Sequence, residues 1–293
     1  MSLIVGIRCT DSIVLAASGP VALASEDGLA PARQRARKLR VVGGIAVMGV
    51  SGHDGLAQEM ALSLERSLAE LDHQKVAEDV LRSSIRDALA APVQRTVAIH
   101  KTLQGLPGFG ITSNDYVLSQ SMVAIPFQDS VRLYALDPEC SLTEITDEHT
   151  YAAIGNTTVA NPFLAFLREV MWQNGGPNQA SAELAAYWTV RHAVESTPAG
   201  LAQPIQLAVM VRRQDESIEI IERGDRELAA IGQMMETRLE AMRRSFATQP
   251  HASGSGGGPK PPPVPTAKPT RKRVPEVRLR LEPPDHGREP DRW

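Results

Sequence analysis

The chain has 293 residues and a formal net charge of −3, and hydrophobic residues make up 42% of it. This length and composition are typical of a globular protein with a substantial core, and the near-neutral charge excludes a broad basic surface for nucleic acid. No stretch reaches the ~18 apolar residues of a membrane span. Cys9 and Cys140 are too few for a disulfide framework, so we predict a cytoplasmic location.

The first predicted elements are two strands that begin almost at the start of the chain. Residues 3–9 and 13–17 are apolar and rich in β-branched side chains, and the turn-forming residues Thr10-Asp11-Ser12 lie between them. No Lys or Arg precedes Leu3, which argues against a secretory signal peptide. Terminal residues are usually loose, so a terminus that enters a strand at once calls for a functional reason.

The following elements come in groups of strands and pairs of helices. Residues 39–42 and 45–50 predict a hairpin about Gly43-Gly44, and residues 54–71 an amphipathic helix. A second helical stretch, 76–103, contains Pro92, which should break or kink it. The remaining predictions are strands at 121–127, 131–136 and 142–146, helices at 159–172 and 179–194, a hairpin of 205–211 with 217–221, and a helix at 227–246.

This order predicts the fold class α+β. Single helices that alternate with single strands are typical of parallel βαβ units, whereas here helices come in pairs between groups of strands. We therefore predict two antiparallel sheets stacked face to face and covered outside by helices, a four-layer αββα sandwich. The aromatic content of 4% suits a tightly stacked interior between the sheets.

A change of composition near residue 248 predicts a domain over residues 2–248 and a disordered tail over 249–293. Eleven of the chain's 21 prolines lie at or beyond Pro250, beside a run of Gly and Ser. Such a segment cannot bury enough apolar surface to fold by itself. Within it, the basic residues 271–273 and the alternating residues 277–281 are the stretches expected to dock on a partner.

Ser2 supplies a reason for a fixed terminus. A small second residue permits removal of Met1, and the α-amino group of Ser2, with a pKa near ~7.7–8.0, could then serve as the base for its own hydroxyl. Nucleophile and base would belong to one residue. Such a site also needs a cation and backbone N–H donors for an oxyanion. Lys38 at the start of a predicted strand and Gly52 at a strand-to-helix junction are the candidates.

Other chemistries are not indicated. The histidines show no H-x-x-x-H spacing and the cysteines are not paired, so neither a metal nor a cofactor is predicted. The glycine-rich stretch 105–110 follows a helix instead of a strand, which argues against phosphate binding. Ser51 lies in a sequence that lacks the last glycine of a nucleophile elbow, and it is interpreted as part of a helix N-cap region.

Over residues 2–225 the chain resembles proteasome β-type subunits, especially their bacterial homologues. The similarity lies in the order and spacing of four stretches: SLIVGIRCTDSIVLAAS, RKLRVVGGIAVMGVSGHDGLAQEM, YAAIGNTTVANPFLAFL and PIQLAVMVRRQDESIEII. The resemblance implies the N-terminal nucleophile hydrolase fold, cleavage of peptide or amide bonds, and self-association into rings or stacked rings. It also implies peptide or protein substrates. The composition of the tail suggests that a partner could dock there, and neither nucleic acid nor a membrane is predicted as a partner.

Residue by residue, Ser2 takes the place of the family's threonine nucleophile, Lys38 matches its lysine, and Gly52 matches its oxyanion glycine. The supporting residues depart from the family. Ser18 stands where the family has Asp, Asn156 stands where it has Ser, and Glu195 is the nearest match to a late Asp. These departures keep two alternatives open: a catalytically silent ring-forming subunit with a structural role, and a small-amide acylase on a related fold.

Overall fold

The computed structural model of the chain describes residues 2–19, 21–22, 33–34, 37–72, 75–104, 119–172, 176–197, 201–215 and 217–247. These residues belong to one compact unit, Met1–Ala247. The predicted tail, with its basic cluster and its alternating stretch, lies outside the described residues, as does the glycine-rich stretch 105–110. None of the described helices combines the length and the apolar character needed to cross a bilayer.

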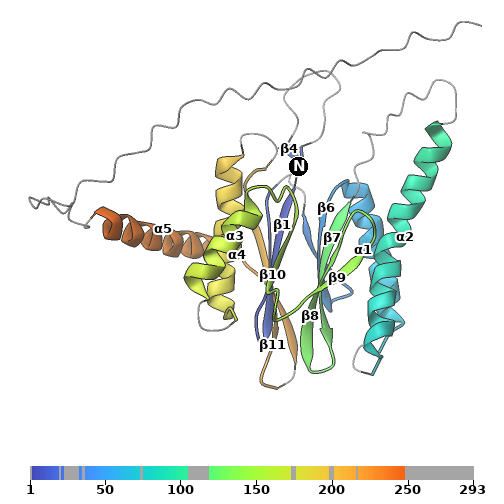
Figure 1. The fold of residues 1–293 in the computed structure, drawn as a ribbon. Coiled ribbons are helices and arrows are strands. Elements are labelled where there is room, and N and C mark those ends of the chain that lie inside the picture. Colours follow the sequence, from blue (N-terminus) through green and yellow to red (C-terminus); the bar gives the residue numbers. More distant parts are fainter. Residues whose placement is uncertain are drawn as a thin grey trace, which may run out of the picture. The chain divides into compact units, whose positions relative to one another are not determined.

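Two five-stranded antiparallel sheets lie face to face (Figure 1). The first sheet has the order β10 (Tyr151–Gly155), β1 (Leu3–Arg8), β2 (Ser12–Ala17), β11 (Gln206–Arg212) and β12 (Ile218–Glu222). The second has the order β5 (Leu39–Val42), β6 (Ala46–Ser51), β7 (Gln120–Phe127), β8 (Ser130–Leu136) and β9 (Leu142–Ile145). A separate two-stranded ladder pairs β3 (Val21–Ala22) with β4 (Arg33–Gln34).

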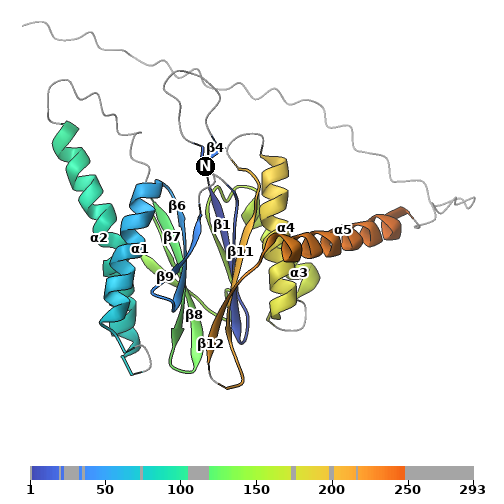
Figure 2. The same ribbon diagram turned by 180° about the vertical axis from the view of Figure 1, so that it is seen from behind.

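Helices cover the outer face of each sheet, as both views show (Figure 1 and Figure 2). The second sheet carries α1 (Asp54–Ala69) and α2 (Glu78–Gln104). The first carries α3 (Ala160–Met171) and α4 (Gln179–Ser196), and α5 (Asp225–Ala247) packs on α4. The predicted αββα sandwich is therefore confirmed.

The space between the sheets is filled by aliphatic side chains and methionine. Ile4 and Leu15 from the first sheet meet Met122 and Leu133 from the second, and all four are essentially inaccessible to solvent. No aromatic residue belongs to this cluster within the described part of the chain. Each such side chain contributes roughly 1.5–3 kcal/mol on burial, so this layer fixes how the sheets sit against each other.

The structure departs from the sequence-based elements at two points. Of the break or kink predicted at Pro92, the break does not occur: α2 continues through it to Gln104. Proline removes a single backbone donor, and the neighbouring Leu89 and Val93 are buried against α1 and the second sheet, which holds the helix together. The strand β10 was not predicted, because its Ala152-Ala153 pair has low β propensity and its pairing with β1 is long-range.

Candidate active site

Ser2 lies where the first strand meets β10 at one end of the sandwich. Ser2 is only 8% exposed to solvent. Leu3 is in register with Gly155, and the backbone N–H of Asn156 donates to the Ser2 carbonyl oxygen at 2.8 Å, which extends the ladder to the second residue. The terminus is thus held by strand pairing, as its apolar sequence predicted.

Gly155 allows the chain to pass close to Ser2. Its φ of +87° is in the region that favours glycine. A methyl group at this position would lie 2.1 Å from the Ser2 carbonyl oxygen and 2.6 Å from Ser51 Oγ. Ser2, Ser51 and Gly155 therefore meet at one point, although they come from three strands of two sheets.

A cavity of about 520 Å³ opens at this point. It is lined by Ser2, Ser51, Gly155, Asn156, Thr157 and Thr158. The structure thus brings Asn156 to Ser2, as predicted from sequence. None of the described residues in this lining carries a charged side chain.

Ser51 is a lining residue that the sequence interpretation missed. The N-cap of α1 is His53, whose Nδ1 accepts a hydrogen bond from Gly55 N at 3.2 Å, so Ser51 does not cap the helix. Ser51 instead ends β6 and is buried against the Ser2 region. A strand that is apolar up to its last residue and then carries a small hydroxyl was the available signal.

Ser18 links Lys38 to the first strand. Its Oγ accepts hydrogen bonds from Leu3 N at 3.1 Å and from Lys38 Nζ at 3.3 Å. Its own backbone N–H donates to the Leu3 carbonyl at 2.9 Å. The structure therefore places the predicted cation one hydroxyl away from the residue that follows Ser2, and Ser18 occupies the bridging position.

Lys38 is buried without an acidic partner among the described residues. It is 6% exposed, and burial lowers the pKa of its amine from 10.5 to about 8. An aspartate at position 18 would oppose that effect, because a nearby carboxylate favours the charged amine. The serine leaves the lysine able to lose its proton close to neutral pH.

Gly52 lies between the end of β6 and the start of α1, as predicted. Its φ is +148°, and a methyl group there would lie 2.1 Å from Ser119 Oγ. Ser119 is fully buried, so no side chain fits at position 52 without displacing it. Because Gly52 directly follows Ser51, its backbone lies at the end of the sandwich where the cavity opens.

Glu195 is not brought to this cluster. It lies on α4, where its exposed side chain pairs with Arg191 at 2.8 Å. Within the described residues, no hydrogen bond or ion pair connects it with Ser2, Ser18 or Lys38. The sequence match that suggested Glu195 was loose, and the structure shows no contact between Glu195 and these residues.

Cys9 follows the end of β1 opposite to Ser2 and is not among the described residues that line this site. Burial raises the pKa of the Cys9 thiol to about 11, so little thiolate is present near neutral pH. In the described part of the chain, no three His, Cys, Asp or Glu side chains gather to hold a metal ion. Ser2 remains the nucleophile candidate.

Two glutamines near the site were also missed by the sequence interpretation. Gln120, the first residue of β7, accepts a hydrogen bond from Gly155 N at 2.8 Å. Gln206, the first residue of β11, accepts from the backbone N–H groups of Lys38 and Leu39 at 2.9 and 3.1 Å. Each contact crosses between the sheets, which a single sequence does not reveal.

Two antiparallel sheets stacked between pairs of helices, with the first strand of the chain held in the interior, form the αββα sandwich that the sequence predicted. Searches of protein-family models and of curated protein sequences found no match to this chain.

Solved structures of Anbu share this fold. Anbu from Yersinia bercovieri, described as an ancestral β-subunit, is 15% identical, with a TM-score of 0.60 over 85% of this chain and 98% of that one. A Gly-1 mutant of Anbu from Hyphomicrobium sp. strain MC1 is 15% identical, with a TM-score of 0.59 over 85% and 97%. A helical assembly of the Anbu complex from Pseudomonas aeruginosa gives 16% and 0.59 over 86% and 99%. At these identities the similarity establishes the fold.

Proposed function

We propose that the chain is a proteasome-like N-terminal nucleophile hydrolase that cleaves peptide or amide bonds with Ser2. The observation that carries the proposal is the Ser18 bridge, which holds the buried Lys38 amine 3.3 Å from a hydroxyl that also binds Leu3 N. A buried lysine with no acidic partner among the described residues is unfavourable for stability, and its placement beside a fixed terminus favours a catalytic role.

In the proposed reaction, Met1 is removed first and Ser2 becomes the terminal residue. Ser2 Oγ attacks the substrate carbonyl, and its proton passes to the Ser2 amine. The C–N bond then breaks as that proton moves to the leaving amine, which leaves an ester on Ser2 that water hydrolyses. The Lys38 charge lowers the pKa of the Ser2 amine, and the Gly52 N–H stabilises the oxyanion.

Self-association is the second part of this proposal. The Pseudomonas neighbour is described as a helical assembly of the Anbu complex, and closed symmetry is the usual outcome for soluble homo-oligomers. We expect the purified chain to form rings or stacked rings, measurable by mass photometry. A monomer at micromolar concentration would contradict this part alone.

The chemistry is tested with a peptide epoxyketone, a probe that needs both the hydroxyl and the amine of a terminal nucleophile. Intact mass should show that Met1 is absent, and peptide mapping should place the adduct on Ser2. Ser2→Ala should assemble as the wild type does but give no adduct, because Ser2 supplies both reacting groups. An adduct in Ser2→Ala, or peptide turnover by a preparation that retains Met1, would refute Ser2 as the nucleophile.

The same experiment separates the alternatives that the sequence left open. An assembled protein that retains Met1 and forms no adduct would be a silent ring-forming subunit. Labelled protein that cleaves small amides but not peptides would be an acylase.

A further inference from the structure

The segment that carries Lys38 is attached to the opposite sheet. Lys38 directly precedes β5, which is the edge strand of the second sheet. One side of an edge strand has no neighbouring strand to accept its backbone N–H groups, so buried donors there need another partner. Gln206 of the first sheet supplies that partner for both Lys38 and Leu39.

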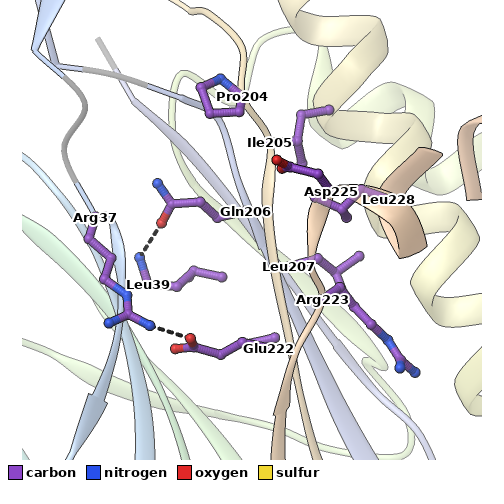
Figure 3. A pocket seen from close by; sticks show the side chains of 11 residues that line it. Arg37, Leu39, Pro204, Ile205, Gln206, Leu207, Glu222, Arg223, Asp225 and Leu228 are labelled. Carbon is purple, nitrogen blue, oxygen red and sulfur yellow. Dashed lines mark hydrogen bonds and ion pairs between the residues drawn. The ribbon is translucent and has the colours of Figure 1, made fainter.

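Figure 3 shows the geometry of this contact: the Gln206 side chain extends from β11 across the gap toward Leu39, with its amide oxygen on the Leu39 N–H. The same oxygen accepts from Lys38 N, so one acceptor serves two consecutive residues. Gln206 is also in register with Ala17, the residue before Ser18. The glutamine that holds the Lys38 backbone is therefore beside the serine that holds the Lys38 amine.

A second contact to the same segment is weaker. Arg37 pairs with Glu222 of β12, and both residues line one pocket with Leu39 and Gln206 (Figure 3). The Arg37 side chain is 63% exposed, and exposed ion pairs contribute little because water and salt screen them. Gln206 is thus the stronger of the two attachments.

We infer that Gln206 is a positioning residue: it fixes the backbone of Lys38 against the first sheet, so that the Lys38 amine stays buried at Ser18. The inference rests on the proposed function for its catalytic meaning, but the position of Lys38 can be measured without catalysis. Replacing Gln206 with Met leaves two backbone donors without this acceptor, and the start of β5 should then move outward and expose the amine.

The experiment is competitive acetylation of the purified protein with acetic anhydride across a pH series, with Lys38 quantified by mass spectrometry. In the wild type, Lys38 should react little and titrate near pH 8. Gln206→Met should raise Lys38 acetylation several-fold and move its midpoint toward 10.5. Gln206→Asn, whose shorter amide cannot reach across, should behave as Gln206→Met does with less disturbance of packing.

Two matched variants separate positioning from general loosening of the sandwich. Gln206→Glu keeps an oxygen acceptor at the same reach and should restore the low reactivity of Lys38. Gln120→Met removes the other inter-sheet glutamine contact, to Gly155, and should leave Lys38 acetylation unchanged.

Unchanged Lys38 reactivity in both Gln206→Met and Gln206→Asn would overturn the inference, as would an equal rise in Gln120→Met. Epoxyketone labelling of the wild type is measured in parallel. Its absence would refute the proposed hydrolase while the acetylation result still decides whether Gln206 positions Lys38.

Discussion

Lys38 is a buried charged residue and Glu144 a half-buried one, both lie near the meeting of the two sheets, and their surroundings are opposite. The Glu144 side chain is 9% exposed and binds Arg132 of β8 at 2.5 Å and Arg8 of β1 at 3.5 Å. Lys38 is 6% exposed, and its amine has only the neutral Ser18 hydroxyl as a hydrogen-bond partner within the described chain.

The difference separates a structural charge from a candidate functional one. A half-buried carboxylate with two arginine partners ties strands together, here β1, β8 and β9. A buried amine with a neutral partner destabilises the folded protein. Its pKa, however, lies near the working pH, as a catalytic group requires. The burial of the Lys38 amine beside a neutral hydroxyl is the observation that calls for a function.

The largest effect is expected for Lys38→Met. The rate of Ser2 labelling should fall on the order of 10²-fold or more, because a pKa-tuning charge is lost. The free energy of unfolding should rise at pH 7, since the lowered pKa corresponds to a destabilisation on the order of 3 kcal/mol at ~1.36 kcal/mol per unit.

The sign of the pH dependence follows from that pKa. The unfolded state binds more protons than the folded state between about pH 8 and 10.5, so the wild type gains stability as pH rises through this range. The free energy of unfolding of Lys38→Met should exceed that of the wild type by the full amount below pH 8, and the difference should vanish near pH 10.5. Urea unfolding at several pH values checks this, and a destabilised Lys38→Met would contradict it.

Glu144→Gln should show the reverse pattern. Unfolding should become easier by about 2–3 kcal/mol, because two arginines lose their buried partner; the Arg132 side chain is 25% exposed, which keeps the loss below that of a fully buried pair. Ser2 labelling of the folded protein should stay within about twofold of the wild type. Parallel urea melts and labelling rates test this, and a large loss of labelling in folded protein would connect the two regions.

Ser18→Asp should make Lys38 resemble Glu144. A carboxylate beside the amine favours its charged form, so the pKa of Lys38 should rise from about 8 by one unit or more. The acetylation midpoint of Lys38 and the pH profile of Ser2 labelling should shift in the same direction. If the midpoint remains near 8, Ser18 does not set the electrostatics of the lysine.

The smallest effect is expected for Arg37→Gln. Arg37 is next to Lys38 in the chain, but unlike Lys38 it is exposed, as is its ion-pair partner Glu222. Stability should change by less than about 0.5 kcal/mol and labelling by less than about twofold. A larger change would mean that attachment of the segment, and not burial, controls Lys38.

The layers of the fold could be predicted, and so could the places of the candidate residues Ser2, Lys38 and Gly52 at the ends of elements, because both depend on local patterns. Leu3–Arg8 is continuously apolar up to Arg8, the Gly43-Gly44 turn joins β5 to β6, and Ser2, Lys38 and Gly52 each stand at the end of such an element. These signals are contained in a few neighbouring residues.

The supporting contacts could not be predicted because they join residues far apart in sequence. Gln206 and Lys38 are separated by 168 positions, and Gln120 and Gly155 by 35, with each pair on two different sheets. The failed match at Glu195 has the same origin: spacing alone placed it on α4, and packing turned that helix face to solvent.

The pairing of β1 with β10 also has a consequence for synthesis of the chain. Ser2 cannot bind Asn156 until Asn156 has left the ribosome, and at ~5–20 residues per second this takes roughly 10–30 s. During that interval an aminopeptidase can reach Met1, whereas in the folded domain Ser2 is buried. The long sequence separation of the two strands therefore leaves a period in which Met1 could be removed, as the proposed function requires, before β1 pairs with β10.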